Sequence, residues 1–265
     1  MDNFKILTEN LIKANGSFVN DLICQPSTEQ MQMLKEGSGN PDSEMRQVNS
    51  SAGLGINFWS SYEQSNPGVQ VDFEWRKRVP LKRGIPANID VVVKEGNIIR
   101  FIESKFLEPY YSGNEVPRNS YLDATKYSSN TKDSPVSWVE LFKKAKEFKY
   151  YNVTQLCRHL LAVSKELWRS PKQYQEREVH LQSICWEMPD SFMASLSDEE
   201  RKEFIVRRGI IQEEAIRCER LLNGFINQHL QFCNLEFNAI KYNDLIGSVH
   251  LQHELREKLK KQYYL

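Results

Sequence analysis

Three charged residues near the middle of the chain lie in segments that otherwise have the pattern of buried β-strands. Asp90 falls within the apolar run ANIDVVVK, and Glu103 and Lys105 fall near the end of the next run, IIRFIESKF. A polar side chain inside a buried strand costs free energy unless a partner or an ion compensates it. The types and positions of these residues therefore predict a site at which the buried charges are compensated by one another or by a bound ion.

A short turn sequence, Gly96 followed by Asn97, separates the two runs and favours a two-residue hairpin loop. With that loop, Asp90 lies opposite Glu103, at a Cβ separation of about 4.5–5.5 Å. Strand alternation places Asp90, Glu103 and Lys105 on one face of the sheet. Two bare carboxylates at that distance repel each other, and a divalent cation that prefers oxygen ligands, such as Mg²⁺, would relieve the repulsion.

The residues alone leave two interpretations of this cluster open. One is a metal site, and the other is a structural group of ion pairs at the end of a strand, because such groups also perturb charges. The tripeptide E-x-K is not specific by itself, since it recurs at 147–149 and 200–202 in segments that are expected to be exposed helices.

The surrounding pattern predicts the elements that would hold the hairpin. Apolar residues at helical spacing predict helices at 1–25, 49–62, 137–149, 153–168, 197–209, 211–230 and 244–262. Runs of β-branched and aromatic residues predict strands at 69–79, 87–94, 98–106, 178–188 and 235–242. Polar segments rich in turn formers predict loops at 25–44 and 108–137. Asn49 or Ser50 is the expected N-cap of its helix, and Gly53 and Gly55 indicate close packing against a neighbour. This order predicts a mixed α/β domain.

Composition and charge narrow the classes of protein. The chain has 265 residues, and its 35 Lys and Arg balance its 35 Asp and Glu, so any contact with nucleic acid must come from a local patch. Its five cysteines are widely spaced without a C-x-x-C motif, which argues against a zinc knuckle or a disulfide framework. The N-terminus lacks the pattern of a signal peptide, and no run approaches the roughly 18 apolar residues that span a bilayer. We therefore expect a cytoplasmic protein without a membrane partner.

An Asp on one strand followed, one hairpin later, by E-x-K resembles the PD-(D/E)XK nuclease superfamily. More narrowly, SSAGLGINFW, IDVVV, FIESKFLEP, QLCRHLLAV and AIKYNDLI are similar to a bacterial branch of restriction-endonuclease-like proteins. The resemblance implies one nuclease-like domain over 1–265, with an extension at 1–46, a core at 47–250 and an insertion at 108–137. It also implies a restriction-endonuclease-like core, a mixed β-sheet in the order α-β-β-β-α-β, flanked by helices and followed by helical C-terminal additions.

The same resemblance implies a role for each matching residue. Asp90 and Glu103 would hold Mg²⁺, with Mn²⁺ as a substitute, and Lys105 would orient or activate the attacking water. The backbone carbonyl of Ser104 would be a further ligand, because it lies between the two functional side chains. Gln155 and His159 match a second block that packs beside the active site. The implied activity is metal-dependent hydrolysis of phosphodiester bonds, with double-stranded DNA as the expected substrate, and a homodimer is left open.

The chain also departs from the pattern of this branch. Ile89 stands where a Pro usually precedes the Asp, and Ala52 stands where branch members often carry Gln. The helix at 47–60 offers no acid as a third metal ligand, although Glu74 or Glu108 could replace it. The missing helix acid and the neutral net charge favour the alternative of a catalytically inactive nuclease-like module that binds DNA or a protein.

For two further groups of residues the sequence allows either contact with nucleic acid or a purely structural role. The basic segment WRKRVPLKRG could contact a phosphate backbone or could be a solvated turn. The tyrosines of the polar segment could line a nucleic-acid groove or could simply pack, with packing favoured; they are Tyr110, Tyr111, Tyr121 and Tyr127.

Overall fold

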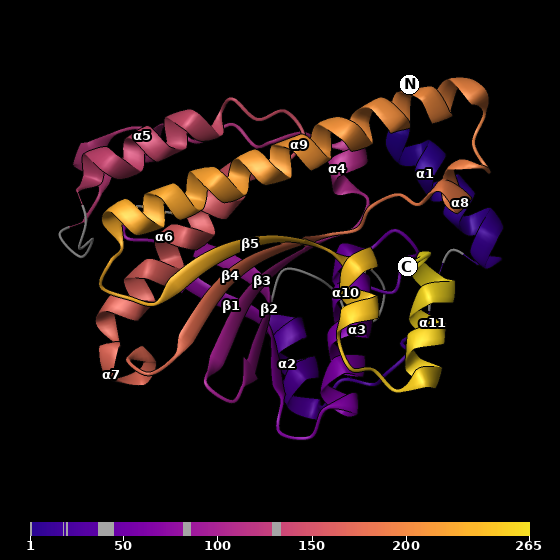
Figure 1. Cartoon of the computed structure of the whole chain (residues 1–265), viewed down its shortest axis with the longest axis horizontal. Helices are drawn as coiled ribbons and strands as arrows, with labels where there is room; N and C mark the ends of the chain where they lie inside the picture. Colours follow the sequence, from indigo (N-terminus) through magenta and orange to yellow (C-terminus); the bar gives the residue numbers. More distant parts are fainter. Residues whose placement is uncertain (1, 18, 20, 37–44, 82–85, 129–133) are drawn as a thin grey trace.

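A five-stranded mixed β-sheet organises the chain in the computed structural model, which describes residues 2–17, 19, 21–36, 45–81, 86–128 and 134–265 (Figure 1). The strands are β1 (Gln70–Arg78), β2 (Pro86–Glu95), β3 (Ile98–Lys105), β4 (Glu178–Cys185) and β5 (Leu235–Lys241). They lie in the order β1-β2-β3-β4-β5, with β1, β2 and β3 antiparallel and with β4 and β5 parallel to β3. The predicted α/β class and the five predicted strands are confirmed.

Helices cover both faces of this sheet. They are α1 (Asn3–Asn15), α2 (Thr28–Glu36), α3 (Ser51–Ser65), α4 (Glu108–Tyr111), α5 (Pro135–Ala145), α6 (Val153–Arg169), α7 (Pro171–Tyr174), α8 (Asp190–Met193), α9 (Asp198–His229), α10 (Tyr242–Ser248) and α11 (His253–Tyr263), with 3₁₀ turns η1 (Asn119–Tyr121) and η2 (Ala124–Lys126). Figure 1 shows α5, α6 and α9 on one side of the sheet and α2, α3, α10 and α11 on the other.

Helix α3 packs directly on the back of the predicted hairpin. Ser50 is its N-cap, and the Ser50 side chain accepts the Gly53 N–H at 3.1 Å. A Cβ added at Gly55 would lie 3.2 Å from the Ser104 Oγ, and one added at Gly53 would lie 2.3 Å from the Met45 carbonyl oxygen. The predicted cap and the predicted close packing of both glycines are confirmed.

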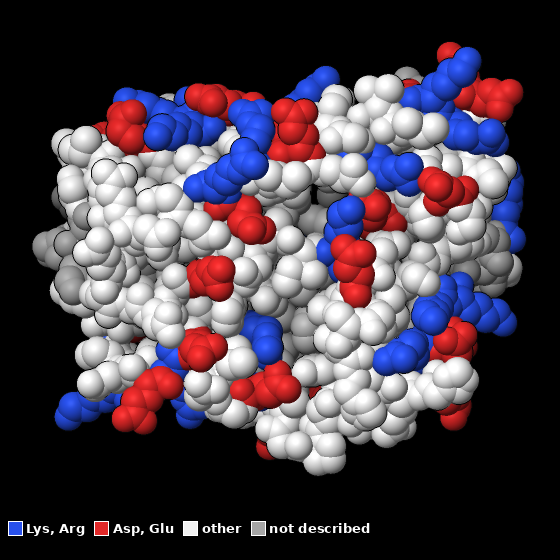
Figure 2. All heavy atoms as spheres, in the orientation of Figure 1, with Lys and Arg blue, Asp and Glu red and all other residues white. Residues whose placement is uncertain are grey.

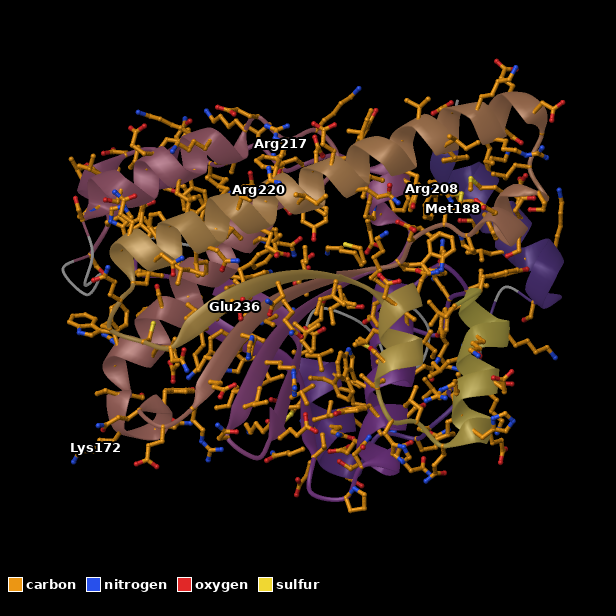
Figure 3. The ribbon with its side chains drawn as sticks, viewed as in Figure 1. Lys172, Met188, Arg208, Arg217, Arg220 and Glu236 are labelled. Atoms are coloured by element: carbon orange, nitrogen blue, oxygen red, sulfur yellow. The ribbon has the colours of Figure 1, made fainter. Side chains whose placement is uncertain are left out.

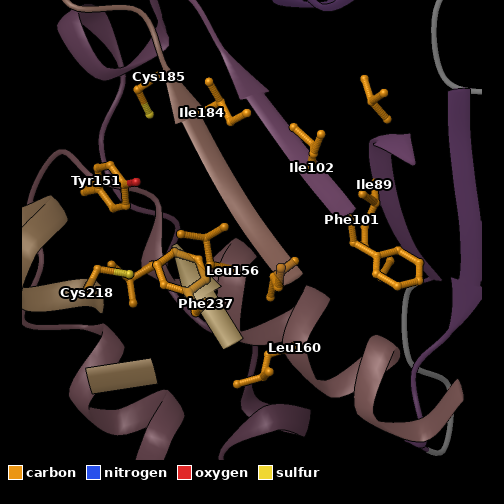
Figure 4. Packing of buried hydrophobic residues seen from close by; sticks show 14 of the residues in the cluster. Ile89, Phe101, Ile102, Tyr151, Leu156, Leu160, Ile184, Cys185, Cys218 and Phe237 are labelled. Atoms are coloured by element: carbon orange, nitrogen blue, oxygen red, sulfur yellow. The ribbon is translucent and has the colours of Figure 1, made fainter. Parts of the chain in front are cut away.

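Alternation along the strands then sends the charged residues to the other face. Ser104 contacts α3, so its neighbours Glu103 and Lys105 face α6 and α9. On that side, Leu156 of α6, Cys218 of α9 and Phe237 of β5 form part of the buried core (Figure 4). The cluster therefore lies between the sheet and two long helices.

The N-terminal expectations need two corrections. The first helix ends at Asn15, because Gly16 adopts a left-handed conformation at φ 71° and closes α1. The expected loop at 25–44 is wrong for its first part, which forms α2. Gln30 of this helix donates to the Val71 carbonyl at 2.7 Å, and Leu34 is buried. These tertiary contacts stabilise a helix whose polar composition does not predict it, and residues 37–44 lie outside the described part.

The tyrosine-rich segment at 108–137 is not an extended loop in its described part. It forms α4, η1, η2 and the start of α5, and residues 129–133 lie outside the description. Tyr110, Tyr121 and Tyr127 are buried, and the Tyr127 hydroxyl donates to the Tyr121 carbonyl at 3.0 Å. The packing interpretation of these three tyrosines is confirmed, because their rings supply the apolar area that holds the segment down.

The C-terminal expectations also change in detail. Helices expected at 197–209 and 211–230 are one helix, α9, which begins with a capping box between Ser197 and Glu200. The helix expected at 244–262 is two, α10 and α11, because the chain between them bonds to the end of α3. There the Gln252 N–H donates to the Ser65 Oγ at 2.9 Å. No helix in the described ranges is long and apolar enough to cross a membrane.

Candidate active site

The hairpin has the predicted register. Glu95 pairs with Ile98, and the antiparallel ladder continues to Val91 and Ile102. Beyond that pair, the Oδ2 of Asp90 accepts the backbone N–H of Ser104 at 2.8 Å. A side chain thus takes the place of the next ladder contact, and it holds Asp90 beside the E-x-K tripeptide as the sequence predicts.

Glu103 lies at the centre of the cluster and is only 1% exposed. Lys105 Nζ lies 2.6 Å from the Glu103 Oε1, and His159 Nε2 lies 2.9 Å from the Oε2. These are ion-pair distances, but neither carboxylate oxygen accepts a hydrogen bond of good geometry from any described residue. His159 is fully buried, and its Nδ1 likewise has no hydrogen-bond partner in the described part of the chain. The predicted neighbour His159 therefore contacts the predicted ligand Glu103 directly.

The two carboxylates have opposite pKa shifts. Burial together with the Glu103 charge raises the pKa of Asp90 well above its usual value. Burial alone would raise the pKa of Glu103 as well, but Lys105 and His159 lower it to about 2. Burial disfavours the charge of Lys105, whereas Glu103, Glu108 and Asp90 together raise its pKa. The protein without a cation thus holds one ionised carboxylate, one ammonium and one carboxyl group that resists ionisation.

This donor set fits a divalent cation at the Asp90 end. Both Glu103 oxygens are buried acceptors that receive no hydrogen bond from the residues the structure describes, and Asp90 is half-buried beside them. The Ser104 N–H points at Asp90, and the carbonyl of a strand residue leaves on the same side as its N–H. Among the described residues, no three His, Cys, Asp or Glu side chains gather as a metal site. Two carboxylates, one carbonyl and several waters would suit Mg²⁺, which keeps part of its hydration shell.

The two candidate replacement acids flank the cluster on different sides. Glu74 of β1 lies between the paired positions Phe73 and Trp75, opposite Asp90, and its charge contributes to the raised pKa of Asp90. Its backbone is left-handed at φ 56°, which is rare inside a strand. Glu108 instead accepts the Phe106 N–H at 3.0 Å and also accepts from the Ser51 hydroxyl. Glu74 therefore belongs to the Asp90 side, and Glu108 to the Lys105 side.

A cavity of about 240 Å³ opens beside Lys105 and is lined by Glu103, Glu108 and Gln155 among others. Gln155 is the remaining residue of the predicted site, and it lies in the first turn of α6, one turn before His159. The structure thus places all six predicted residues around one strand end. They are Asp90, Glu103, Ser104, Lys105, Gln155 and His159.

Two residues of this region are absent from the sequence prediction. Asn152 lines the cavity and caps α6, a position that its place before the helix could have indicated. Glu214 of α9 is buried and accepts the N–H groups of Lys149, Tyr150 and Tyr151 at 2.7, 2.8 and 2.9 Å. Nothing in the sequence indicates this contact, because it joins segments more than 60 residues apart.

The basic residues of the segment WRKRVPLKRG lie in different environments. Lys77 lies 3.3 Å from Glu166 of α6, whereas Arg76 and Arg78 are exposed, and Lys82 and Arg83 lie outside the described residues. On the face seen in Figure 2, blue and red side chains are interspersed rather than gathered in one field. Arg208, labelled beside Met188 in Figure 3, donates to the Met188 carbonyl at 2.9 Å.

Comparisons of the chain with protein-family models, with curated proteins and with solved structures find no match. The geometry around Asp90, Glu103 and Lys105 therefore carries the functional argument.

Proposed function

We propose that the protein is a Mg²⁺-dependent nuclease that hydrolyses phosphodiester bonds, with double-stranded DNA as its substrate. The observation that carries this proposal is the convergence of Asp90, Glu103 and Lys105 at one strand end. Asp90 bonds to the residue between the other two, and Lys105 lies 2.6 Å from Glu103. Two carboxylates that share a cation, next to a fixed ammonium, are the groups that phosphodiester hydrolysis requires.

Each residue has a distinct role in this proposal. Asp90, Glu103 and the Ser104 carbonyl hold the cation, which when bound lowers the pKa of water and neutralises charge on the scissile phosphate. Lys105 is an ammonium at neutral pH, since its acidic neighbours raise its pKa. It therefore does not remove a proton, and it acts by stabilising negative charge on the attacking water and on the phosphate. His159 holds the Glu103 carboxylate in place from the α6 side.

The order of elements supports the same proposal. Helix α3 precedes the antiparallel strands β1, β2 and β3, and α6 precedes β4, which pairs parallel to β3. From this order we infer a restriction-endonuclease-like core, for which the sequence α-β-β-β-α-β is expected. In this arrangement Asp90 and Glu103 follow the last pair of the β2–β3 ladder, Val91 and Ile102.

The direct test is the incubation of plasmid DNA with purified protein and Mg²⁺ or Mn²⁺. We expect cleavage by the wild type and a loss of about 100-fold or more in Lys105→Ala, the scale for removing a charge-stabilising group. Lys202→Ala is the matched control, because Lys202 belongs to the same tripeptide in an exposed helix. Equal activity of the wild type and Lys105→Ala would contradict the catalytic assignment.

A second candidate is an inactive nuclease-like module that binds DNA or a protein partner. The contacts of Glu103 favour it, because Lys105 and His159 already compensate the buried carboxylate without a cation. Calorimetric titration with Mg²⁺ separates the two candidates. A nuclease binds the cation with an affinity that Asp90→Asn abolishes, whereas an inactive module shows no binding that depends on Asp90.

A further inference from the structure

Two amide side chains stand together at the edge of the cavity beside Lys105. Asn152 caps α6, and its Oδ1 accepts the backbone N–H groups of Gln155 at 3.2 Å and Glu115 at 3.3 Å. Only an oxygen can accept these protons, so the capping role fixes the orientation of the Asn152 amide. Its Nδ2 must therefore face the other way.

That orientation determines how Gln155 is oriented as well. The Asn152 Nδ2 donates to the Gln155 Oε1 at 3.1 Å and to the Glu115 Oε1 at 3.3 Å. Since the Gln155 oxygen is held by Asn152, the NH₂ end of the Gln155 amide remains for a ligand. Among the described residues, no acceptor bonds to this Nε2.

The three glutamate carboxylates that line the same cavity each have a cationic or hydrogen-bonding neighbour. Glu103 contacts Lys105, and Glu108 accepts from Ser51 and from the Phe106 N–H. The third glutamate of the cavity likewise has partners, because Arg158 Nη1 lies 3.4 Å from Glu115 Oε2 and Asn152 donates to its Oε1. A ligand that enters therefore finds donors at Gln155 and Lys105, which suits a group that only accepts hydrogen bonds, such as a phosphodiester oxygen.

The backbone on either side of Asn152 is anchored by hydrogen bonds to other segments. Glu214 fixes the backbone of 149–151 through three N–H groups, and the Thr154 N–H donates to the Asn114 Oδ1 at 3.0 Å. Asn152 lies between these two anchors. Donors that are in place before the substrate arrives do not have to be reoriented during the reaction.

We propose that Asn152 is a positioning residue, which turns the Gln155 amide so that its Nε2 donates to a non-bridging oxygen of the substrate phosphate. This inference rests on the proposed nuclease function and deepens it, because it assigns a phosphate subsite to the cavity beside Lys105. It requires no cation at the subsite, and both donors belong to this chain.

The test is a double-mutant cycle between Asn152→Asp and Gln155→Met, measured as single-turnover cleavage of a DNA duplex with Mg²⁺. An aspartate still caps the helix, but it can only accept, so the Gln155 NH₂ turns toward it and leaves the substrate. We expect each single variant to lose about 100-fold in rate, the scale for one oxyanion donor, and the double variant to lose no more. Glu115→Gln in the Asn152→Asp background removes the new like-charge pair, and it should restore little activity. Thermal melting checks that every variant is folded.

The inference would be overturned if Asn152→Asp lowered the cleavage rate by the same factor in the wild type and in the Gln155→Met background. This holds even if the wild type is an active nuclease. A second readout separates the inference from the proposed function. Inorganic phosphate should shift the NMR signal of the Gln155 side-chain amide, identified by its absence in Gln155→Met, and should not shift it in Asn152→Asp. A shift in a wild type that cleaves no DNA would refute the nuclease and keep the subsite. An unmoved signal would refute the subsite, whatever the cleavage assay gives.

Discussion

The Asp90 carboxylate accepts the backbone N–H of Ser104 at 2.8 Å, so an acid on one strand is bonded to the residue between Glu103 and Lys105 on the next. The bond orients Asp90, but it does not compensate the burial of its charge, because its pKa remains well above the usual value. An acid in this condition is costly to the fold while no cation is bound. That cost leads to the first two predictions.

Replacement of Asp90 by Asn should stabilise the protein at neutral pH and abolish cleavage. A raised pKa means that the unfolded chain ionises first as the pH rises above 3.8, so the ionisation of Asp90 lowers the free energy of unfolding above that value. We expect a gain of about 1 kcal/mol or more at pH 7, or roughly 2–4 °C per kcal/mol in Tm. The gain should disappear toward pH 3, and urea unfolding at several pH values measures it. A lower stability of Asp90→Asn at pH 7 would contradict the assigned shift.

Divalent cations should raise the Tm of the wild type without DNA. A cation that binds only the folded chain stabilises it by about 2.7 kcal/mol at one hundred times its Kd. Asp90→Asn and Glu103→Gln should lose this response, because each removes one of the two carboxylates. Asp72→Asn is a suitable control, since Asp72 is ion-paired to Lys94 at 2.7 Å elsewhere on the sheet. A response that survives in Asp90→Asn would place the cation elsewhere.

Glu103 should contribute stability that is lost in acid. Its pKa is lowered from 4.5 to about 2, so its contribution is complete above pH 4.5 and declines as the pH falls through that range. The full contribution is of the order of 3 kcal/mol. Glu103→Gln should therefore show a shallower loss of stability between pH 4.5 and pH 2 than the wild type. Parallel acid limbs in the two proteins would show that Glu103 is not held as an ion.

The close packing of α3 should make Gly53 intolerant of a methyl group. A Cβ there would lie 2.3 Å from the Met45 carbonyl oxygen, and a backbone atom cannot move aside cheaply. We expect Gly53→Ala to cost about 1–3 kcal/mol, the scale for overpacking. Gly224→Ala in α9 is the matched control, because a Cβ added there would have no described atom within 4 Å apart from its chain neighbours and the nearby backbone of its own helix. It should gain up to about 1 kcal/mol from helix propensity, so the two substitutions should shift the urea midpoint in opposite directions.

Glu214 should stabilise the wall of the cavity through its three backbone contacts. Hydrogen bonds to a charged group contribute about 1.5–3 kcal/mol each, and Glu214→Gln replaces one accepting oxygen with a donor. We expect a loss of about 1–3 kcal/mol and faster amide hydrogen exchange at Tyr150 and Tyr151. Glu213→Gln, on the exposed side of the same helix, should change stability by less than about 0.5 kcal/mol.

The sequence by itself determined most of the local structure and the position of Asp90 beside Glu103 and Lys105 in the candidate site. The Gly96 turn and the alternation of two apolar runs suffice to set the hairpin register, and that register brings Asp90 to the E-x-K tripeptide. The reason is that a strand has a period of two, so one turn of known length decides which side chains share a face. The cap at Ser50 and the close packing of Gly53 follow from equally local rules.

Only the tertiary structure decided the contacts between distant segments. Helix α2 exists because Gln30 bonds to the backbone of β1, and the C-terminal helix divides because Gln252 bonds to the end of α3. The pKa of Glu103 depends on His159, and the cavity wall depends on Glu214; both are residues on other elements, brought close only when the sheet and helices assemble. Sequence patterns report the local conformation of the chain, whereas burial and charge depend on neighbours that the complete fold supplies.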